Sequence, residues 1–278
     1  MDLAALLFGL LAALSLGIAD FSGGAAARSG EPSAVAAWTW GSVGLAGLVI
    51  GPLGSAPFRV SVLGWGILGG LLAAIGTTVL FYGIANGRVA IVAPLSAVVG
   101  ASVPVVLDAF SGPTFSGTVV AGIGLALVGV VMTTWSGAGD RGSLALSVST
   151  GLVAGLALAL LFVVTANTLD DGVWVIGPVG LATFAVLAAA SMATQRSMRI
   201  TGSARNWTAV AGIGTAIAYT SFLLSAAESS FGLAAVVTSL YPAVTVLAAV
   251  AVWKERPAMI QRVGLVVVVA AVALLGGG

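Results

Sequence analysis

Ten long apolar runs follow one another along this chain, and they limit its possible folds more than any other feature. A helix that crosses a bilayer needs about 20 mainly apolar residues. The runs have about that length, and they are continuously apolar rather than alternating, which argues against a transmembrane β-barrel. The sequence therefore predicts an all-α integral membrane protein with ten transmembrane helices, at residues 3–26, 33–54, 62–86, 89–110, 115–135, 144–167, 174–192, 207–228, 231–253 and 259–276.

Charged residues are scarce, and most of them lie between the apolar runs. Ten Lys and Arg and nine Asp and Glu make up 7% of the 278 residues, whereas soluble domains average about 25%. The first run has no basic segment before it and no clear cleavage site, so we expect a retained helix rather than a signal peptide. The net charge of +1 argues against a nucleic-acid partner.

The chain contains no His and no Cys, which removes several classes of chemistry. Imidazole proton relays, thiol nucleophiles and His or Cys metal sites are excluded. An intramembrane enzyme would need a nucleophile with its base, or metal ligands, and no such pattern is present. We therefore expect neither an enzyme nor a cofactor. A helper subunit that packs on a partner is also disfavoured, because no exposed polar stripe is visible.

Three features recur in residues 1–137 and 138–278, which suggests two repeats of five helices. The third helix of each half contains Ile-Gly-Thr, the fourth has an internal proline, and a turn with proline follows the fourth. Two repeats with an odd number of helices must lie in the membrane with opposite orientations. Such inverted repeats are typical of secondary transporters, whose substrate site lies near the midplane between the halves.

The second half also carries a more specific signature. The stretch from Gly232 to Pro242 precedes Lys254-Glu255-Arg256-Pro257, and a last helix then begins with Gln261-Arg-Val-Gly264. This arrangement resembles the repeat signature of the drug/metabolite transporter superfamily, and more narrowly the EamA family of ten-helix transporters. The first half departs from it, because its turn reads Phe110-Ser111-Gly112-Pro113 and the nearby acid is Asp108.

The resemblance implies a secondary transporter of the bacterial inner membrane that works by alternating access. It implies a central cavity lined by the first, third, fourth, sixth, eighth and ninth helices. We expect export of a small polar or amphipathic metabolite, with proton coupling as a hypothesis. The alternative is an uncoupled facilitator or an uptake carrier for a sugar-like solute. A monomer and a homodimer both remain open. Glycines at GxxxG spacing are interpreted as close helix packing rather than as a dimer signature.

Asp20 is the main candidate for the functional site. If the first helix is centred near residue 14, Asp20 lies about 9 Å from that centre along the axis, inside a hydrocarbon layer of about 15 Å half-thickness. A carboxylate there costs at least ~2.5 kcal/mol, so it should face a cavity or a partner. Asp20 would then bind a proton or the substrate. The alternative is a residue at a helix end that reaches the interface or packs on a polar group.

Other residues could line the same cavity. Tyr241 and Pro242 lie at the centre of the ninth helix, where proline frees a backbone carbonyl, although simple kinking is the alternative. Trp40 is either a lipid-facing side chain or part of an aromatic wall. The remaining candidates are polar side chains and a second proline, for which hydrogen bonding between helices is the alternative: Tyr82, Asn86, Pro94, Ser96, Tyr219 and Thr238.

Asp108 and Glu228 lie near helix ends. We expect surface exposure for both, with a gate salt bridge as the alternative. The basic residues gather after the odd-numbered helices, so the positive-inside rule places both termini outside. Members of the resembled family are commonly drawn with cytoplasmic termini, and the orientation therefore remains open.

Overall fold

A computed structural model describes residues 2–54, 56–87, 89–111, 116–134, 143–253 and 258–277. This part of the chain is helical and contains no strand. Two short 3-10 helices, η1 (Gly51–Leu53) and η2 (Leu169–Asp171), precede α3 and α7. The α-helices are α1 (Leu3–Ala27), α2 (Pro32–Ile50), α3 (Ser61–Asn86), α4 (Val89–Ser111), α5 (Gly117–Thr134), α6 (Leu144–Ala166), α7 (Ile176–Ala193), α8 (Ser203–Ala227), α9 (Phe231–Thr238), α10 (Tyr241–Trp253) and α11 (Met259–Gly277).

The helices begin where the sequence offers caps. Asp2 accepts a hydrogen bond of 2.7 Å from the backbone N–H of Ala5 at the start of α1. Ser143 and Ser230 cap α6 and α9 in the same way, and Pro32 occupies the first turn of α2. These caps satisfy N–H groups that have no partner within the first turn of a helix.

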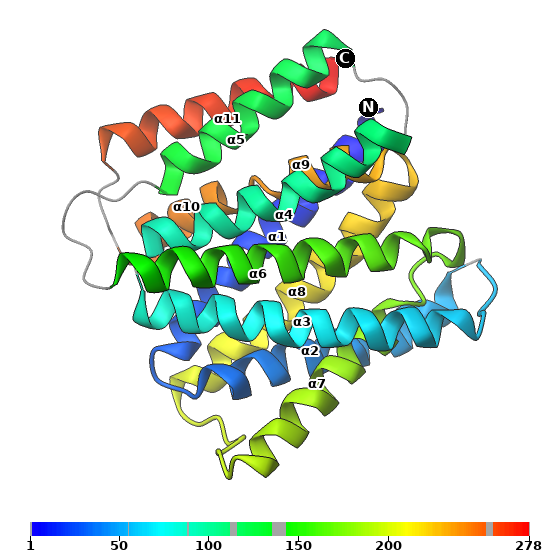
Figure 1. The fold of residues 1–278 in the computed structure, drawn as a ribbon, viewed down its shortest axis with the longest axis vertical. Coiled ribbons are helices and arrows are strands. Elements are labelled where there is room, and N and C mark those ends of the chain that lie inside the picture. Colours follow the sequence, from blue (N-terminus) through cyan, green and yellow to red (C-terminus); the bar gives the residue numbers. More distant parts are fainter. Residues whose placement is uncertain are drawn as a thin grey trace.

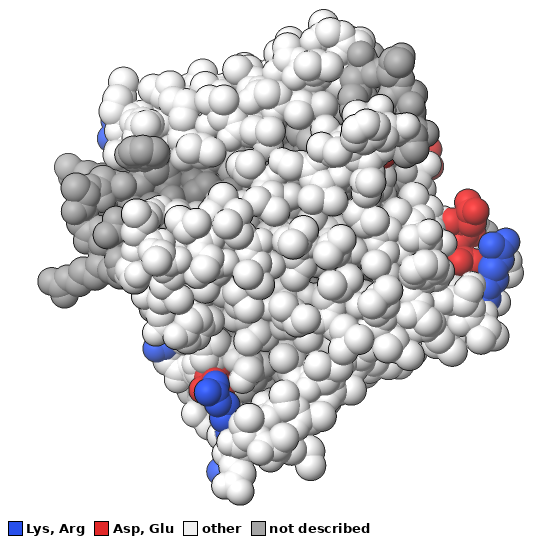
Figure 2. All heavy atoms as spheres, in the orientation of Figure 1, with Lys and Arg blue, Asp and Glu red and all other residues white. Residues whose placement is uncertain are grey.

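The predicted all-α membrane protein is confirmed at the level of class. Within the described residues, seven helices are long and apolar enough to cross a membrane: α1, α2 with η1, α3, α4, α6, α7 and α8. The apolar stretches in α5, α9 to α10 and α11 are shorter, so a count of ten crossings stays a prediction. Figure 2 shows charged side chains along two edges of the visible face and an uncharged region between them, as a lipid-facing surface requires.

The packing joins helices from the two ends of the sequence. α1 packs on α8, α2 on α7, α3 on α6, and α5 on α11, while α4 packs on α6 and α1 also contacts α9 and α10. In Figure 1, α5 and α11 lie side by side at one end of the molecule and α7 lies at the other end. Residues from both halves of the chain therefore meet in the interior.

Glycines bring the backbones of α2 and α7 close together. A Cβ on Gly47 would lie 2.2 Å from the backbone nitrogen of Gly177, and one on Gly180 would lie 2.2 Å from that of Gly44. Small residues permit this approach between membrane helices. The glycines at GxxxG spacing in α3 and α6 likewise face other helices of the same chain.

Two ion pairs close the opposite ends of the α2–α7 pair. At one end, Glu31 precedes α2 and Arg196 follows α7, and Arg196 Nη1 lies 2.8 Å from Glu31 Oε1. At the other end, Arg59 follows α2 and Asp171 precedes α7, and Arg59 Nε lies 3.3 Å from Asp171 Oδ1. Each ion pair joins a loop of the first half to a loop of the second half. The glycine contacts and the two ion pairs together hold α2 and α7 along their length.

Candidate functional site

A break in the apolar run at residues 231–253 forms the centre of the candidate site. α9 ends at Thr238 and α10 begins at Tyr241. Ser239 closes α9 with its backbone N–H on the carbonyl of Ala235 at 2.8 Å. Pro242 has no N–H, so the carbonyl of Thr238 lacks the donor that a continuous helix would supply. The run that the sequence predicts as one helix is therefore two helices that meet inside the protein.

A cavity lies at this break. Its volume is about 100 Å³, and its lining is mostly apolar. The lining comes from α1, α2, α3, α4, α6, α8, α9 and α10, so α2 joins the six helices expected from the family resemblance. The lining residues are Leu16, Ala19, Asp20, Thr39, Trp40, Thr77, Leu80, Phe81, Ser96, Ala97, Gly100, Ala101, Leu158, Leu161, Phe162, Thr215, Ala218, Tyr219, Phe222, Ala235, Thr238, Ser239 and Tyr241.

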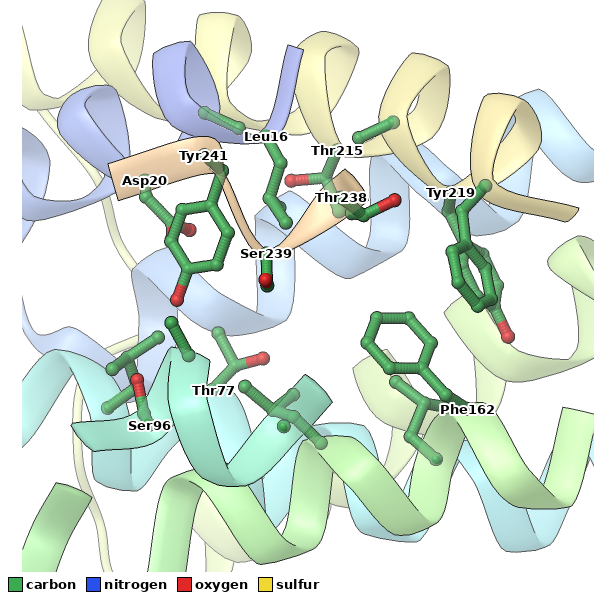
Figure 3. A pocket seen from close by; sticks show the side chains of 18 of the residues that line it. Leu16, Asp20, Thr77, Ser96, Phe162, Thr215, Tyr219, Thr238, Ser239 and Tyr241 are labelled. Carbon is green, nitrogen blue, oxygen red and sulfur yellow. The ribbon is translucent and has the colours of Figure 1, made fainter. Parts of the chain in front are cut away.

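Asp20 is the single ionisable carboxylate in this described lining, and no Lys or Arg lines the cavity with it. Its side chain lies beside Tyr241, whose hydroxyl points toward Ser96 (Figure 3). Among the described residues no cation forms an ion pair with Asp20. The structure thus places this carboxylate in the lining of the cavity.

Aromatic rings form another part of the wall. Trp40 is 5% exposed, and its Nε1–H donates a 2.9 Å hydrogen bond to Thr77 Oγ1. Its ring meets that of Tyr219 edge to face, with the centroids 5.9 Å apart. The rings of Phe162 and Phe222 lie 4.4 Å apart. These contacts fix the rings, and Figure 3 shows Phe162 and Tyr219 on the side away from Asp20.

Trp38 lies only two positions before Trp40 and has a different environment. It is exposed, and its Nε1–H donates a 2.9 Å hydrogen bond to the carbonyl of Met198. Trp38 therefore lies on the outer surface, whereas Trp40 follows the second of its two alternatives and lies in the cavity wall.

Two buried threonine hydroxyls of the lining have no hydrogen-bond partner among the described residues. Thr39 is 2% and Thr238 is 3% exposed, and Oγ1 of each is unpaired. Leaving such a group unsatisfied costs about 1–3 kcal/mol. A bound solute or water would supply the missing bonds. By contrast, Ser96, Thr215 and Ser239 each donate to a carbonyl within their own helix turn.

Tyr82 and Asn86 are absent from the described lining of this cavity. Tyr82 is 49% exposed. Asn86 is also exposed, and its side-chain amide donates a 3.0 Å hydrogen bond to the backbone carbonyl of Tyr82. Pro242 is buried at the start of α10, next to Tyr241 of the lining. Pro94 lies in α4, but its side chain is outside the described part of the chain. The turn with Glu255 also lies outside the described residues.

The two gate candidates form no salt bridge among the described residues. Asp108 Oδ2 accepts a 2.6 Å hydrogen bond from the backbone N–H of Gly232, so the carboxylate of α4 caps the first turn of α9. Asp108 is half-buried, which corrects the expectation of surface exposure. Glu228 is exposed at the end of α8, as expected. Helix-end capping by a carboxylate from another helix depends on tertiary contact, which the sequence does not reveal.

Sequence reasoning missed several lining residues. Thr39 and the rings of Phe81, Phe162 and Phe222 carry no charge and interrupt no helix, so nothing in the sequence separates them from their neighbours. Thr77 had a usable signal, because it belongs to the Ile-Gly-Thr motif that recurs in both halves. Ser239 had a usable signal, because it lies three positions before the proline that breaks the run.

Comparisons with known proteins agree with the predicted resemblance. Residues 145–277 match the EamA-like transporter family, and this span runs from α6 to α11. The whole chain is similar to a crystal structure of a protein with a TM-score of 0.79 and 22% sequence identity, over 99% of this chain and 96% of that chain. At this identity the likeness establishes the fold alone. No curated protein matches the chain.

Proposed function

We propose that the chain is a member of the EamA-like transporter family, whose model matches residues 145–277, and that it is a secondary active transporter that exports a small amphipathic metabolite by alternating access. The match to a transporter family supports the expectation that the protein is not an enzyme. The multi-pass helical fold agrees with a membrane location, and we propose the bacterial inner membrane. The proposal includes proton coupling through Asp20.

The observation that carries the proposal is the cavity at the helix break. Its lining comes from α1 to α4 and from α6, α8, α9 and α10, so both halves of the chain contribute. Discontinuous helices at such a position are typical of secondary transporters, because broken backbone is tolerated in a membrane only where protein or a cavity surrounds it. A carboxylate that faces this cavity without a cationic partner is the type of group that binds a proton or a charged solute.

The packing supports two inverted repeats, residues 1–137 and 138–278. In the two repeats α1 corresponds to α6, α3 to α8, and α4 to α9 with α10. α1 packs on α8, and its counterpart α6 packs on α3; α1 also packs on α9 and α10, and α6 packs on α4. α2 packs on its own counterpart α7, and α5 on its counterpart α11. This exchange of partners is what a two-fold axis between the halves would produce. A site on that axis becomes accessible from either side when the halves rock against each other.

Transport by the purified protein in liposomes tests the proposal. Efflux of a loaded metabolite mixture, separated by mass spectrometry, identifies solutes that leave only vesicles containing the protein. A pH gradient should accelerate their efflux, and D20N should remove that acceleration because it removes the titrating carboxylate. E228Q is the matched control, since Glu228 is exposed outside the cavity.

Two results separate the proposed mechanism from its alternatives. A rate that does not respond to the gradient would identify an uncoupled facilitator. Full proton-coupled transport by D20N would exclude Asp20 as the coupling residue. Uptake of a sugar-like solute is disfavoured by the lining, because its mostly apolar surface offers few partners for the many hydroxyls of a sugar.

A further inference from the structure

We propose that the cavity recognises a small organic cation, an ammonium group attached to an apolar or aromatic body, with Asp20 as its counter-ion. This inference rests on the proposed transport function and names the substrate class of the same site. It follows from three properties of the described lining: the character of its polar groups, the separation of its two ends, and its size.

The polar groups of the cavity lining favour a donor-rich, positively charged group. Asp20 brings a negative charge, and no Lys or Arg in the described lining neutralises it. The carbonyl of Thr238 lacks the donor that a continuous helix would supply, because Pro242 has no N–H. The hydroxyl oxygens of Thr39 and Thr238 have no hydrogen-bond partner within the described part of the chain. An ammonium group carries three N–H donors and no acceptor, so it complements carboxylate, carbonyl and hydroxyl oxygens together.

An anionic group has no comparable place in the cavity. No cationic side chain lines it in the described part of the chain. The start of α10 is a weak substitute, because Pro242 lacks an N–H and the N–H of Ala243 already bonds the carbonyl of Leu240 at 3.0 Å. The carbonyl end of α9 lies at the same break, and its partial negative charge opposes that of an anion. The geometry therefore disfavours acids, and zwitterions gain less than simple amines.

The other end of the cavity suits an apolar or aromatic body. Phe162 and Tyr219 lie across the cavity from Asp20 (Figure 3), and Trp40 and Phe222 pack against them. Aromatic walls bind flat apolar groups through stacked and edge-to-face contacts, and they also attract cations. A molecule with an ammonium group at one end and a ring at the other would place each end against its matching wall.

The size of the cavity sets the size of the ligand. A single water needs about 10–15 Å³ measured in this way, so about 100 Å³ has room for a ligand of about seven to ten non-hydrogen atoms. Phenethylammonium has nine non-hydrogen atoms and a ring, and it serves as the probe. Neutral 2-phenylethanol and anionic phenylacetate keep the ring and nearly the same size, so they form a series in which chiefly the charge changes.

Isothermal titration calorimetry of the purified protein in detergent at neutral pH measures the binding of all three probes. We expect phenethylammonium to bind at least tenfold more tightly than 2-phenylethanol, and phenylacetate to bind more weakly than either. In D20N the advantage of the cation over the alcohol should disappear, while 2-phenylethanol should still bind. E228Q should keep the wild-type order, and size-exclusion chromatography checks that each variant remains folded.

Three results would overturn the inference: equal affinity for the cation and the alcohol, tightest binding of the anion, or an unchanged preference for the cation in D20N. Absence of binding by all three probes would also overturn it. Counterflow of the same probes in liposomes keeps the two proposals apart. Saturable transport of the alcohol or the acid without that of the cation would refute the substrate class and leave the transporter intact.

Discussion

The close contact between α2 and α7 gives a prediction whose magnitude follows from the structure. In G47A the new methyl group would lie 2.2 Å from the backbone nitrogen and 2.6 Å from the Cα of Gly177, and 2.7 Å from the carbonyl carbon of Ile176. All three atoms belong to backbone and cannot rotate away. Ordinary contact begins near 3.4 Å, so the helices must separate locally by about 1.2 Å.

A matched control is needed to separate the strain in G47A from the gain in helix propensity. Glycine and alanine differ in helix propensity by about 1 kcal/mol, and this gain would partly hide the strain in G47A. G64A in α3 makes the same exchange at a position where no atom lies within 4 Å of the new methyl group. Overpacking costs about 1–3 kcal/mol, and contact with rigid backbone favours the upper end. We therefore expect G47A to unfold with a free energy ~2–3 kcal/mol below that of G64A.

Reversible unfolding in mixed micelles, with denaturing detergent as the variable and circular dichroism as the readout, measures this difference. The separation should also displace α2, which carries Thr39 and Trp40 of the cavity, so G47A should bind ligand more weakly than G64A. Equal free energies of unfolding for the two variants would refute the argument that α2 and α7 meet through backbone.

Other contacts give further expected outcomes. R59Q should lower the free energy of unfolding by about 1–3 kcal/mol, because it leaves the buried carboxylate of Asp171 without its cation. R196Q should change the free energy of unfolding by less than about 1 kcal/mol, because both partners of its ion pair with Glu31 reach solvent. The same micelle titration measures both, and a larger loss in R196Q would contradict this account. D108A should cost about 1 kcal/mol by removing the acceptor for the N–H of Gly232 and should loosen α9, which hydrogen exchange would detect; unchanged protection of the first turn of α9 would argue against the cap.

The helices themselves could be predicted because lipid imposes a simple rule. Backbone groups have no water to bond in the hydrocarbon, so each long apolar run must form its own hydrogen bonds as a helix. The observed starts of α1, α3 and α6 lie within one residue of the predicted runs. The exception is the run at 231–253, where Pro242 marks a break that the sequence indicates but does not resolve into two helices.

The faces of these helices were much harder to predict. In a soluble protein, polar residues mark the outer face, but a membrane helix is apolar on both sides, so the pattern is nearly uniform. Tyr82 and Asn86 therefore seemed suitable for a cavity and lie on an exposed face instead. Trp38 and Trp40 were indistinguishable in the sequence, yet the structure places them in different environments.

The sequence alone determined the solvent of this protein, its helical class, its resemblance to a transporter family, and Asp20 as a charge within a helix. Those conclusions depend on composition, run length and the cost of a carboxylate in lipid, and each of them can be judged within one segment. Only the tertiary structure decided what Asp20 faces. Tyr241, which lies beside it, and the aromatic wall across the cavity come from helices far apart in the chain. Their meeting depends on packing between the two halves, and no local pattern records that packing.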